Sequence, residues 1–284
     1  MKKALVLEGG SLRSMFSAGV LDVFLEQGID FNGAFGTSAG SLTLISFIAG
    51  QAGRTKRVNL NFAQEKDYVG YYTFLKNHSV FNFNYMFKEI SDILIPLDRE
   101  KFENSPCDFT ATTTSCQTGK TVYHNKHTSS NIYKAIEAGS SMPILSPIIN
   151  IDGEPYLDGG ITDAAPYQKA LDEGYDKIVL VLTREHGFLK SMPSPMLARL
   201  YAKHYSQYPQ FFHALMNTSR MYERQMREID RLEYEKRIFV IRPEKPVNVS
   251  RMERDTTKLL HLYEEGRQNA EKNLENLAQY FANK

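Results

Sequence analysis

Short apolar runs alternate with amphipathic segments along the N-terminal part of the chain. The run Ala4–Leu7 is continuous and apolar, which is typical of a strand buried on both faces. A glycine turn follows it, and residues 15–25 then carry apolar side chains at helical spacing. A second run at 33–35 leads through another glycine turn into the apolar helical segment 42–49. Two successive strand–helix units predict an α/β fold with a largely parallel sheet.

The pattern predicts further elements in the rest of the chain. A compact helix is expected between Asp163 and Gly174, because Pro166 stands where a helix begins and the glycine where it ends. Longer helices are predicted over 220–236 and over 255–281, where apolar side chains recur at helical spacing. The remaining apolar runs predict strands at Phe109–Thr113, Thr121–His124, Lys177–Thr183 and Arg237–Arg242.

The sequence shows no repeat, low-complexity tract or proline- and glycine-rich linker that would divide it. We therefore expect residues 1–284 to form a single domain, since this length can bury a substantial core. Helical inserts are expected around 54–105 and 188–236, and a C-terminal helix over 252–282. Each insert carries a cluster of aromatic residues. We expect most of these to pack the inserts onto the core; the alternative is an apolar groove for an acyl chain or a lipid-facing surface.

Composition and charge exclude several classes of protein. The chain has 34 Lys and Arg against 33 Asp and Glu, a formal net charge of +1, whereas proteins that bind phosphate backbones usually carry a basic excess. Nucleic acid is therefore not an expected partner. Cys107 and Cys116 cannot form a disulfide framework and are expected to be buried thiols. With no signal-peptide core and no apolar stretch near the roughly 20 residues of a membrane span, we expect a cytoplasmic protein.

The segment Gly36-Thr37-Ser38-Ala39-Gly40 is the most informative part of the sequence. A serine hydroxyl is a weak nucleophile that needs exposure, a nearby base and a setting that stabilises negative charge. A sharp strand-to-helix turn exposes Ser38, while Gly36 and Gly40 leave room for neighbouring backbones. The following helix favours developing negative charge at its N-terminus. A serine that merely caps this helix is the competing interpretation, which the pattern alone disfavours only slightly.

A second glycine turn, Glu8-Gly9-Gly10-Ser11-Leu12-Arg13-Ser14, links the first strand to the first helix. It fits neither the dinucleotide-binding fingerprint nor a P-loop. Backbone N–H groups near Gly10 and Ser11 could form an oxyanion hole, with Arg13 fixing the loop or attracting an anionic headgroup. Loss of one such donor typically costs about 3–4 kcal/mol of transition-state stabilisation. A tight turn with a surface arginine is the alternative.

The candidate base is Asp158, in Tyr156-Leu157-Asp158-Gly159-Gly160. It ends an apolar run just before a glycine turn, so its carboxylate could project toward Ser38, and desolvation would raise its pKa. An ordinary Asp-Gly turn is the alternative. Seven histidines offer other bases, but none lies in a recognisable motif. His124 and His127 lack a further partner at metal-ligand spacing, so no metal site is predicted.

In order and spacing, these segments resemble the patatin-like phospholipase family of serine lipid acyl hydrolases. The resemblance rests on the loop 9–14, the turn 36–40 and the Asp158-Gly159-Gly160 turn, with support from 138–147 and 161–166. It covers residues 1 to about 183. It implies a three-layer α/β hydrolase domain, with a mostly parallel central sheet and helices on both faces.

The resemblance also implies a mechanism. Ser38 is the nucleophile and Asp158 the base of a Ser–Asp dyad that hydrolyses a lipid or other acyl ester through an acyl-enzyme, with no catalytic histidine, metal or organic cofactor. The oxyanion loop is Gly9, Gly10, Ser11 and Arg13, and the glycines that shape the two turns are Gly36, Gly40, Gly159 and Gly160.

Two serines depart from the family pattern. Ser11 and Ser14 stand where glycines are usual, and a backbone-only oxyanion hole tolerates Ser11 if its φ is negative. A catalytically weak lipid-binding or regulatory protein with the same fold is therefore one alternative, and an acyltransferase with the same nucleophile is another. Peripheral contact with a membrane and the oligomeric state stay open.

Overall fold

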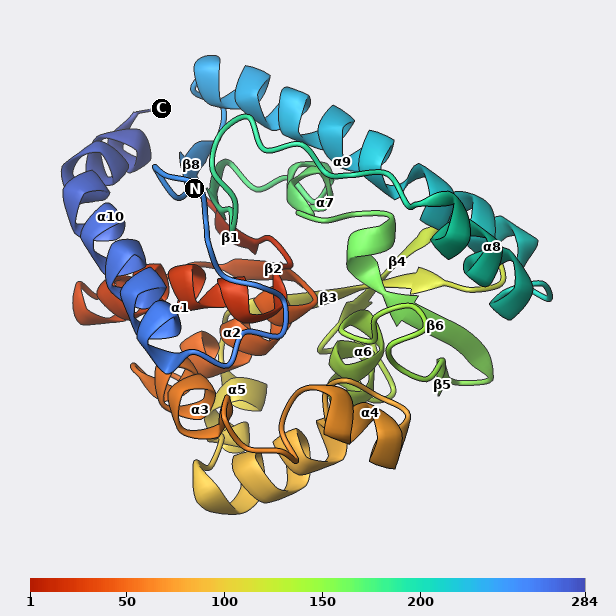
Figure 1. Ribbon diagram of the computed structural model, residues 1–284. Coiled ribbons are helices and arrows are strands. Elements are labelled where there is room, and N and C mark those ends of the chain that lie inside the picture. Colours follow the sequence, from red (N-terminus) through yellow and green to blue (C-terminus); the bar gives the residue numbers. More distant parts are fainter. Residues whose placement is uncertain (284) are drawn as a thin grey trace.

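In the computed structural model, which describes residues 1–283, eight strands form one sheet with helices on both faces (Figure 1). Strand β1 (Lys3–Leu7) lies inside the sheet, and β2 (Gly33–Thr37) and β7 (Lys177–Val181) pair with it in parallel. Beyond them, β3 (Asp108–Ser115) is parallel to β2, and β8 (Phe239–Ile241) is parallel to β7. The predicted α/β class with a mostly parallel central sheet is confirmed.

The other strands add an antiparallel part at β3. Strand β4 (Thr121–Asn125) pairs along one side of β3, and β6 (Glu154–Asp158) pairs with the C-terminal part of β3. The short strand β5 (Ile149–Ile151) lies against β6, and its three residues are too few to show a pattern in the sequence. Strands β2 and β6 both pair with β3 on the side opposite β4, so they approach each other end to end.

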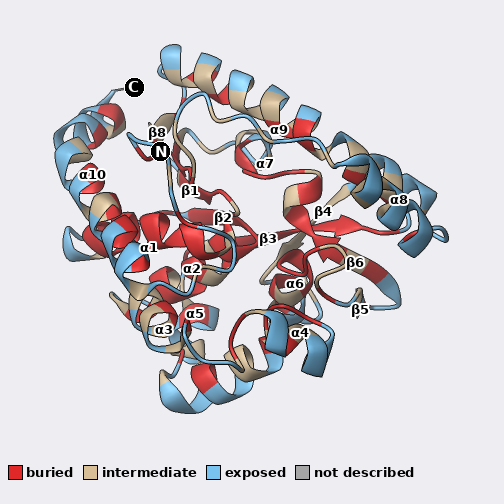
Figure 2. Cartoon of the chain, in the orientation of Figure 1, coloured by how far each residue is buried: buried red, intermediate tan, exposed pale blue. Residues whose placement is uncertain are grey.

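The side chains of β1 point alternately into two cores on opposite faces of the sheet. Leu5 and Leu7 pack in a large cluster with the helices of one face, whereas Ala4 and Val6 pack in a second cluster with those of the other. Strand β1 is therefore buried on both faces, as its apolar run predicts, and Figure 2 shows the buried strands among helices with exposed outer surfaces. One face carries α1 (Ser14–Glu26), α2 (Ala39–Ile48), α5 (Arg99–Asn104), α6 (Ile132–Gly139) and α10 (Thr256–Ala282), and the other carries α7 (Tyr167–Asp172) and α9 (Pro209–Tyr234).

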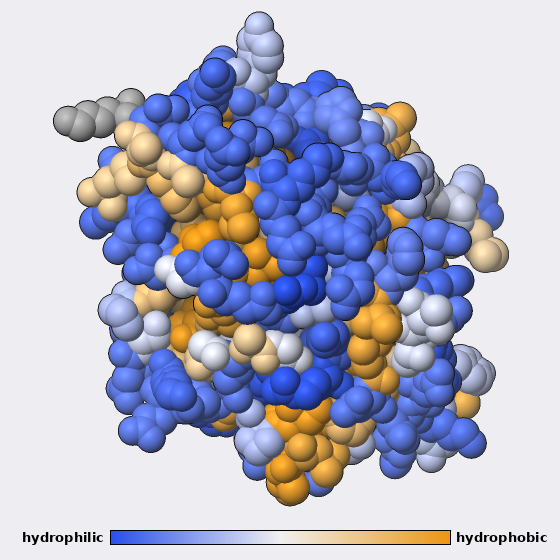
Figure 3. Space-filling view, turned by 90° about the vertical axis from the view of Figure 1, so that its left-hand side faces the viewer, coloured by the Kyte–Doolittle hydropathy of each residue, from blue (hydrophilic) through white to orange (hydrophobic). Residues whose placement is uncertain are grey.

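The first predicted insert folds as helices with an apolar cluster of their own. It contains α3 (Arg54–Phe62), α4 (Tyr71–Asn77) and a π-helix, η2 (Tyr85–Leu94), ahead of α5. Most of its aromatic side chains pack in one cluster, as expected, but Tyr71 is 74% exposed. The helix η2 lies at the lower end of the molecule in Figure 1, and Figure 3 shows a hydrophobic patch at that end.

The second predicted insert and the tail are also helical. Helix α8 (Pro195–His204) has no buried residue. Helix α9 begins at Pro209 and is longer than the segment predicted over 220–236, because the aromatic stretch before it continues the same buried face through Phe211. Helix α10 matches the expected C-terminal helix and packs along α1 (Figure 1). Within residues 1–283, no helix combines the length and apolar composition that crossing a bilayer requires. The assignment of the whole chain to a single domain stays a prediction.

Candidate active site

Ser38 lies at a strained turn between β2 and α2. Its backbone has φ +54° and ψ −127°, a combination that residues with a side chain rarely adopt. The two flanking glycines allow this turn to pack closely. A Cβ atom at Gly36 would lie 2.7 Å from the amide nitrogen of Ser41, and one at Gly40 would lie 2.8 Å from the carbonyl oxygen of Leu7. Any larger residue at either glycine position would therefore collide with the backbone around Ser38.

The hydroxyl of Ser38 donates a hydrogen bond of 3.0 Å to the carboxylate Oδ2 of Asp158, 120 positions later in the chain. The sheet brings the two residues together. Strand β3 pairs Thr112 with Thr37, the residue before the serine, and pairs the next residue, Thr113, with Asp158. The end-to-end meeting of β2 and β6 on one side of β3 thus places both side chains at the same point of the sheet.

Asp158 is held by backbone as well as side-chain contacts. Its Oδ1 accepts a hydrogen bond of 2.7 Å from the amide of Gly160, so the glycine turn after β6 fixes the carboxylate. Its own amide donates to the carbonyl of Ser141, and its carbonyl accepts from the hydroxyl of Thr114. These contacts fix both the backbone and the carboxylate on a rigid strand end.

Burial raises the pKa of the Asp158 carboxyl above its ordinary value, because the charged form loses hydration. The hydrogen bonds from Gly160 and Ser38 act in the opposite direction. The positive charges of Arg251 and Lys190 also oppose the shift. A carboxylate with a raised pKa is a stronger proton acceptor than an ordinary aspartate, as a general base requires.

The loop after β1 leaves two backbone amides free beside the serine. Gly9 packs against Ser38, but its amide already donates to the carbonyl of Ala164, so it shapes the loop and has no free donor. Across the described residues, the amides of Gly10 and Ser11 have no hydrogen-bond acceptor. Ser11 has φ +51°, so the negative φ that would make this serine unstrained is not found.

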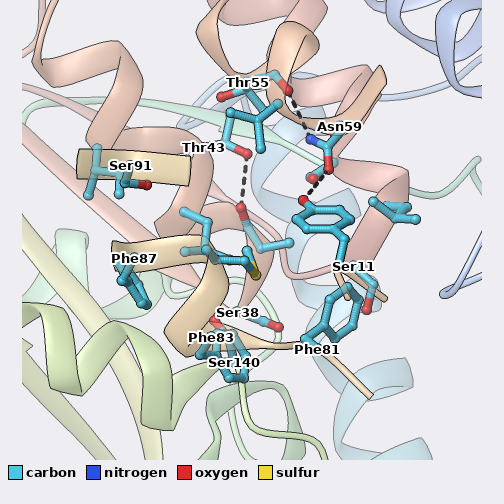
Figure 4. Close-up of a pocket in the computed structure, with 18 of the residues that line it drawn as sticks. Ser11, Ser38, Thr43, Thr55, Asn59, Phe81, Phe83, Phe87, Ser91 and Ser140 are labelled. Carbon is cyan, nitrogen blue, oxygen red and sulfur yellow. Dashed lines mark hydrogen bonds between the residues drawn. The ribbon is translucent and has the colours of Figure 1, made fainter. Parts of the chain in front are cut away.

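A small apolar cavity of about 70 Å³ opens beside Ser38 (Figure 4). Figure 4 shows Ser11 and Ser38 near Phe81, Phe83 and Phe87, which come from the first insert. The alternative role for the aromatic residues, the lining of an apolar groove, therefore applies to some of them. The rest of the apolar wall consists of Leu12, Ala39, Leu42, Ile45, Val58, Tyr68 and Met86.

A larger cavity of about 520 Å³ holds both Ser38 and Asp158 in its wall. The loop after β1, several residues between 184 and 222, and Arg251 also line it. Burial and the charge of Arg184 lower the pKa of Arg13 to about 10. Burial and the charge of Arg251 lower the pKa of Lys190 to about 8. Charged residues in this wall are Glu8, Arg13, Asp158, Arg184, Lys190 and Arg251.

The other candidate residues lie away from this site. None of the histidines in the described part of the chain lines either cavity, and His124 hydrogen-bonds the hydroxyl of Thr113. Residues 1–283 contain no group of three or more His, Cys, Asp or Glu side chains suited to a metal ion. Cys107 and Cys116 are buried free thiols, as predicted, and burial raises the pKa of each to about 12.

Asp163 links the turn that carries Ser38 to distant elements. Its carboxylate accepts hydrogen bonds of 2.7 Å from the hydroxyl of Tyr123 on β4 and from the side-chain amide of Gln225 on α9. Its carbonyl accepts from the hydroxyl of Thr37, next to the serine. Burial raises its pKa, so these donors compensate a desolvated group. Helix α9 therefore supports the serine turn.

Sequence reasoning missed several charged residues of the larger cavity. Glu8 and Arg184 follow β1 and β7, and the carboxyl ends of neighbouring parallel strands are where ligands bind in open α/β sheets, so this signal was available. Lys190 and Arg251 lie in irregular segments before α8 and α10. These segments carry no periodic pattern, so the sequence holds no comparable signal for them.

The fold and the site define the class of α/β proteins that present a serine at a strand-to-helix elbow. Comparison of the sequence with family models then places it within that class. The chain belongs to the patatin-like phospholipase family, whose model matches residues 5–171. Residues 208–282 match a second model, a domain of unknown function (DUF6363).

Two known proteins are similar to this chain. The uncharacterized protein YjjU of Escherichia coli (strain K12) is 28% identical over 189 residues, which cover 63% of this chain and 51% of YjjU. The chain thus spans about half the length of that curated relative. The crystal structure of VipD from Legionella pneumophila aligns with a TM-score of 0.50 and 14% identity, covering 97% of this chain and 67% of VipD. At that identity, the likeness to VipD concerns the fold alone.

Proposed function

We propose that the protein is a serine lipid acyl hydrolase that cleaves carboxylic esters through an acyl-enzyme. The observation that carries the proposal is the 3.0 Å hydrogen bond from Ser38 to Asp158 at the strained turn. Family membership supports a lipid substrate. Formation and hydrolysis of the acyl-enzyme both use only the side chains and backbone amides already described.

In the first step, the Ser38 Oγ attacks the ester carbonyl carbon while its proton passes to Asp158. The oxyanion accepts hydrogen bonds from the free amides of Gly10 and Ser11 and from the first amides of α2, which have no partner within the helix. The tetrahedral intermediate collapses when the ester C–O bond breaks. Asp158 returns the proton to the departing alkoxide, and the acyl group stays on the serine.

In the second step, water attacks the acyl-enzyme. Asp158 accepts a proton from the water as its oxygen bonds to the acyl carbon, and the same amides stabilise the second oxyanion. The bond between the acyl carbon and Ser38 Oγ then breaks, the serine regains the proton from Asp158, and the fatty acid leaves. The raised pKa of Asp158 favours its role as proton acceptor in both steps.

The two cavities divide the substrate between them. The acyl chain enters the apolar cavity of Phe81, Phe83 and Phe87, where its burial stabilises the complex by about 0.8 kcal/mol per methylene. The alcohol part of the ester lies in the larger cavity with Asp158. This arrangement positions the carbonyl carbon at Ser38, which belongs to both walls.

The exposed apolar side chains around α8 are the proposed contact with a lipid surface. Leu189, Met192, Met196 and Leu200 are between 47% and 80% exposed, and Met192 also lines the larger cavity. A net charge of +1 gives little attraction to anionic lipid, so apolar contact has to dominate. Met196→Ser should therefore weaken co-sedimentation with phosphatidylcholine vesicles, and unchanged co-sedimentation would contradict this contact.

Fatty-acid release from a phospholipid tests the proposed function. Ser38→Ala should abolish release, measured by mass spectrometry of the products, because within residues 1–283 no other hydroxyl hydrogen-bonds the Asp158 carboxylate. Ser206→Ala, which removes an exposed hydroxyl between α8 and α9, should release fatty acid at the wild-type rate. Release by Ser38→Ala at the wild-type rate would contradict the proposal. With glycerol added, free fatty acid should remain the main product; a new acylglycerol would instead indicate an acyltransferase.

A catalytically weak lipid-binding protein is the second candidate, and the positive φ of Ser11 is the observation that favours it. Strain at Ser11 can move the backbone amides of the loop away from the position of the oxyanion. Reproducible turnover of acyl esters that depends on Ser38 would exclude this candidate.

A further inference from the structure

Four cationic side chains gather in the larger cavity. Arg13, Arg184, Lys190 and Arg251, here called the basic cluster, share its wall with Ser38. They come from four separate segments: the turn after β1, the end of β7, the segment before α8 and the segment before α10. Charged residues that merely face solvent often lie next to one another in the sequence. These four lie far apart in the sequence, and the fold brings them into one cavity.

The basic cluster is not neutralised by ion pairs. Within residues 1–283, no carboxylate lies within 4.0 Å of any of its four side chains. Arg184 donates to the carbonyl of Val247 and stacks on the ring of Phe188, and Lys190 lies over the ring of Tyr222. The four positive charges outnumber the carboxylates in this wall and repel one another, so an anionic ligand would relieve that repulsion.

Arg13 adds a buried positive charge to the wall of the cavity. Its side chain is only 9% exposed, and its buried Nε has no hydrogen-bond partner in the described part of the chain. An unfilled donor on a buried charged group is costly, and native proteins normally satisfy such donors. Arg13 also lines the larger cavity, so its buried charge belongs to the same cationic site.

The charges in the cavity indicate a dianion. The four cations face two carboxylates, Glu8 and Asp158, so the formal excess is two positive charges. Glu8 is already engaged, because its Oε2 accepts hydrogen bonds from the backbone and the hydroxyl of Thr183. A phosphate monoester carries about −1.5 to −2 charges at pH 7 and offers three acceptor oxygens. Arginine side chains bind such a group in bidentate fashion.

We infer that the basic cluster binds the phosphate monoester of an acyl ester substrate whose acyl chain lies in the apolar cavity. The inference rests on the proposed function and names its substrate class: diacyl- or monoacylglycerol phosphates, in preference to phosphocholine lipids and uncharged glycerides. A cavity of about 520 Å³ is within the usual range for binding a small molecule.

Hydrolysis of three lipids with identical acyl chains tests the preference. Dioleoylglycerol phosphate, dioleoyl phosphatidylcholine and dioleoylglycerol are presented in mixed micelles of one uncharged detergent, so that surface charge stays low. The value of kcat/KM should be at least tenfold higher for the phosphate monoester than for the other two. Equal values for the three lipids would overturn the inference but leave the serine hydrolase proposal intact, whereas loss of all hydrolysis in Ser38→Ala supports that proposal separately.

Substitutions in the basic cluster should reduce the preference for the phosphate monoester, and not only the overall rate of hydrolysis. In Arg184→Gln and in Arg251→Gln, the ratio of kcat/KM for the monoester to that for dioleoylglycerol should fall about tenfold, because each loses a charge-assisted contact. Arg224→Gln removes an exposed charge on α9 outside the cavity and should keep the wild-type ratio. An unchanged ratio in both cluster variants would contradict the assignment.

Binding to the Ser38→Ala protein separates this inference from catalysis. Calorimetry with dihexanoylglycerol phosphate, below its micelle concentration, should give at least tenfold tighter binding than dihexanoyl phosphatidylcholine. Adding Arg251→Gln should remove most of that difference. Inorganic phosphate alone should bind more weakly than the lipid phosphate; equal affinity would indicate a site for free phosphate and overturn a headgroup site. Equal binding of the two lipids would overturn the inference even if no hydrolysis were observed.

Discussion

The two cavities that meet at Ser38 differ in their chemistry and, in part, in the segments of the chain that form them. The apolar cavity is built from residues 11–91 and Ser140, all within the span that matches the family model. Much of the larger cavity comes from residues 184–222 and Arg251, beyond that span. The proposed reacting groups and the proposed acyl site therefore both lie within the span that matches the family model. In the proposed function, Arg184, Lys190 and Arg251 of the later segments recognise the alcohol part of the substrate together with Arg13, which lies within the matched span.

The largest expected effect is at Asp158, the proposed base, which lines the larger cavity beside Ser38. Asp158→Asn keeps the size of the side chain but removes the proton acceptor, so kcat should fall by about 10²- to 10⁴-fold for every ester. Steady-state hydrolysis of a short uncharged ester measures it. Asp30→Asn removes an exposed carboxylate and serves as the matched control. Near-normal hydrolysis by Asp158→Asn would indicate a different base.

A smaller effect is expected in the apolar cavity, where a substitution should change the preference for the acyl chain but not the preference for the headgroup. Phe87→Ala enlarges the acyl cavity, so kcat/KM for an oleoyl ester relative to an acetyl ester should fall about tenfold, within the 1–3 kcal/mol typical of a changed apolar contact. The preference for a phosphate monoester should not change. Tyr71→Ala, an exposed aromatic of the same insert, should behave as wild type. Loss of the headgroup preference in Phe87→Ala would contradict the proposal that the acyl chain and the headgroup bind in separate cavities.

The dependence of hydrolysis on pH should report the pKa of Asp158, the proposed base. Its carboxylate accepts a proton only above its pKa, and burial raises that pKa, so the acid limb of kcat/KM should lie at higher pH than for an ordinary aspartate. Lys190→Gln removes a positive charge that lowers this pKa, so the limb should move to still higher pH. Phe87→Ala should leave it in place. A Lys190→Gln limb shifted to lower pH would contradict the assigned electrostatics.

The smallest effect is expected at the serine of the oxyanion loop. Ser11→Gly relieves a positive φ that costs about 1–2 kcal/mol, but glycine also gains freedom in the unfolded chain. The free energy of unfolding, measured with denaturant, should therefore change by less than about 1 kcal/mol and kcat by only a few-fold. A rise in kcat of two orders of magnitude would instead support the catalytically weak alternative.

Much of the fold could be predicted because the strands carry clear apolar runs. The run Ala4–Leu7 became a strand buried on both faces, and the Gly36 and Gly40 spacing marked the turn that holds the serine. Strand β5 and the early start of α9 were not predicted. Three residues carry too little pattern, and tertiary packing extends the buried face of the helix.

The candidate site was predicted only in part, for physical reasons. Ser38 and Asp158 stand in short patterns, but their meeting depends on the register of β3, which the sequence does not encode locally. The dihedral angle of Ser11 depends on the loop around it. Lys190 and Arg251 reach the cavity from irregular segments whose course is set by packing and not by periodicity.

Covalent labelling with a fluorophosphonate tests the central claim most directly, because it reports the nucleophile without knowledge of the natural ester. Intact-mass spectrometry of the wild type and of Ser206→Ala should show one adduct, located at Ser38 by peptide mapping. Ser38→Ala should show none, and Asp158→Asn should label at least a hundredfold more slowly. An adduct on another residue, or labelling of Ser38→Ala at the wild-type rate, would contradict the account.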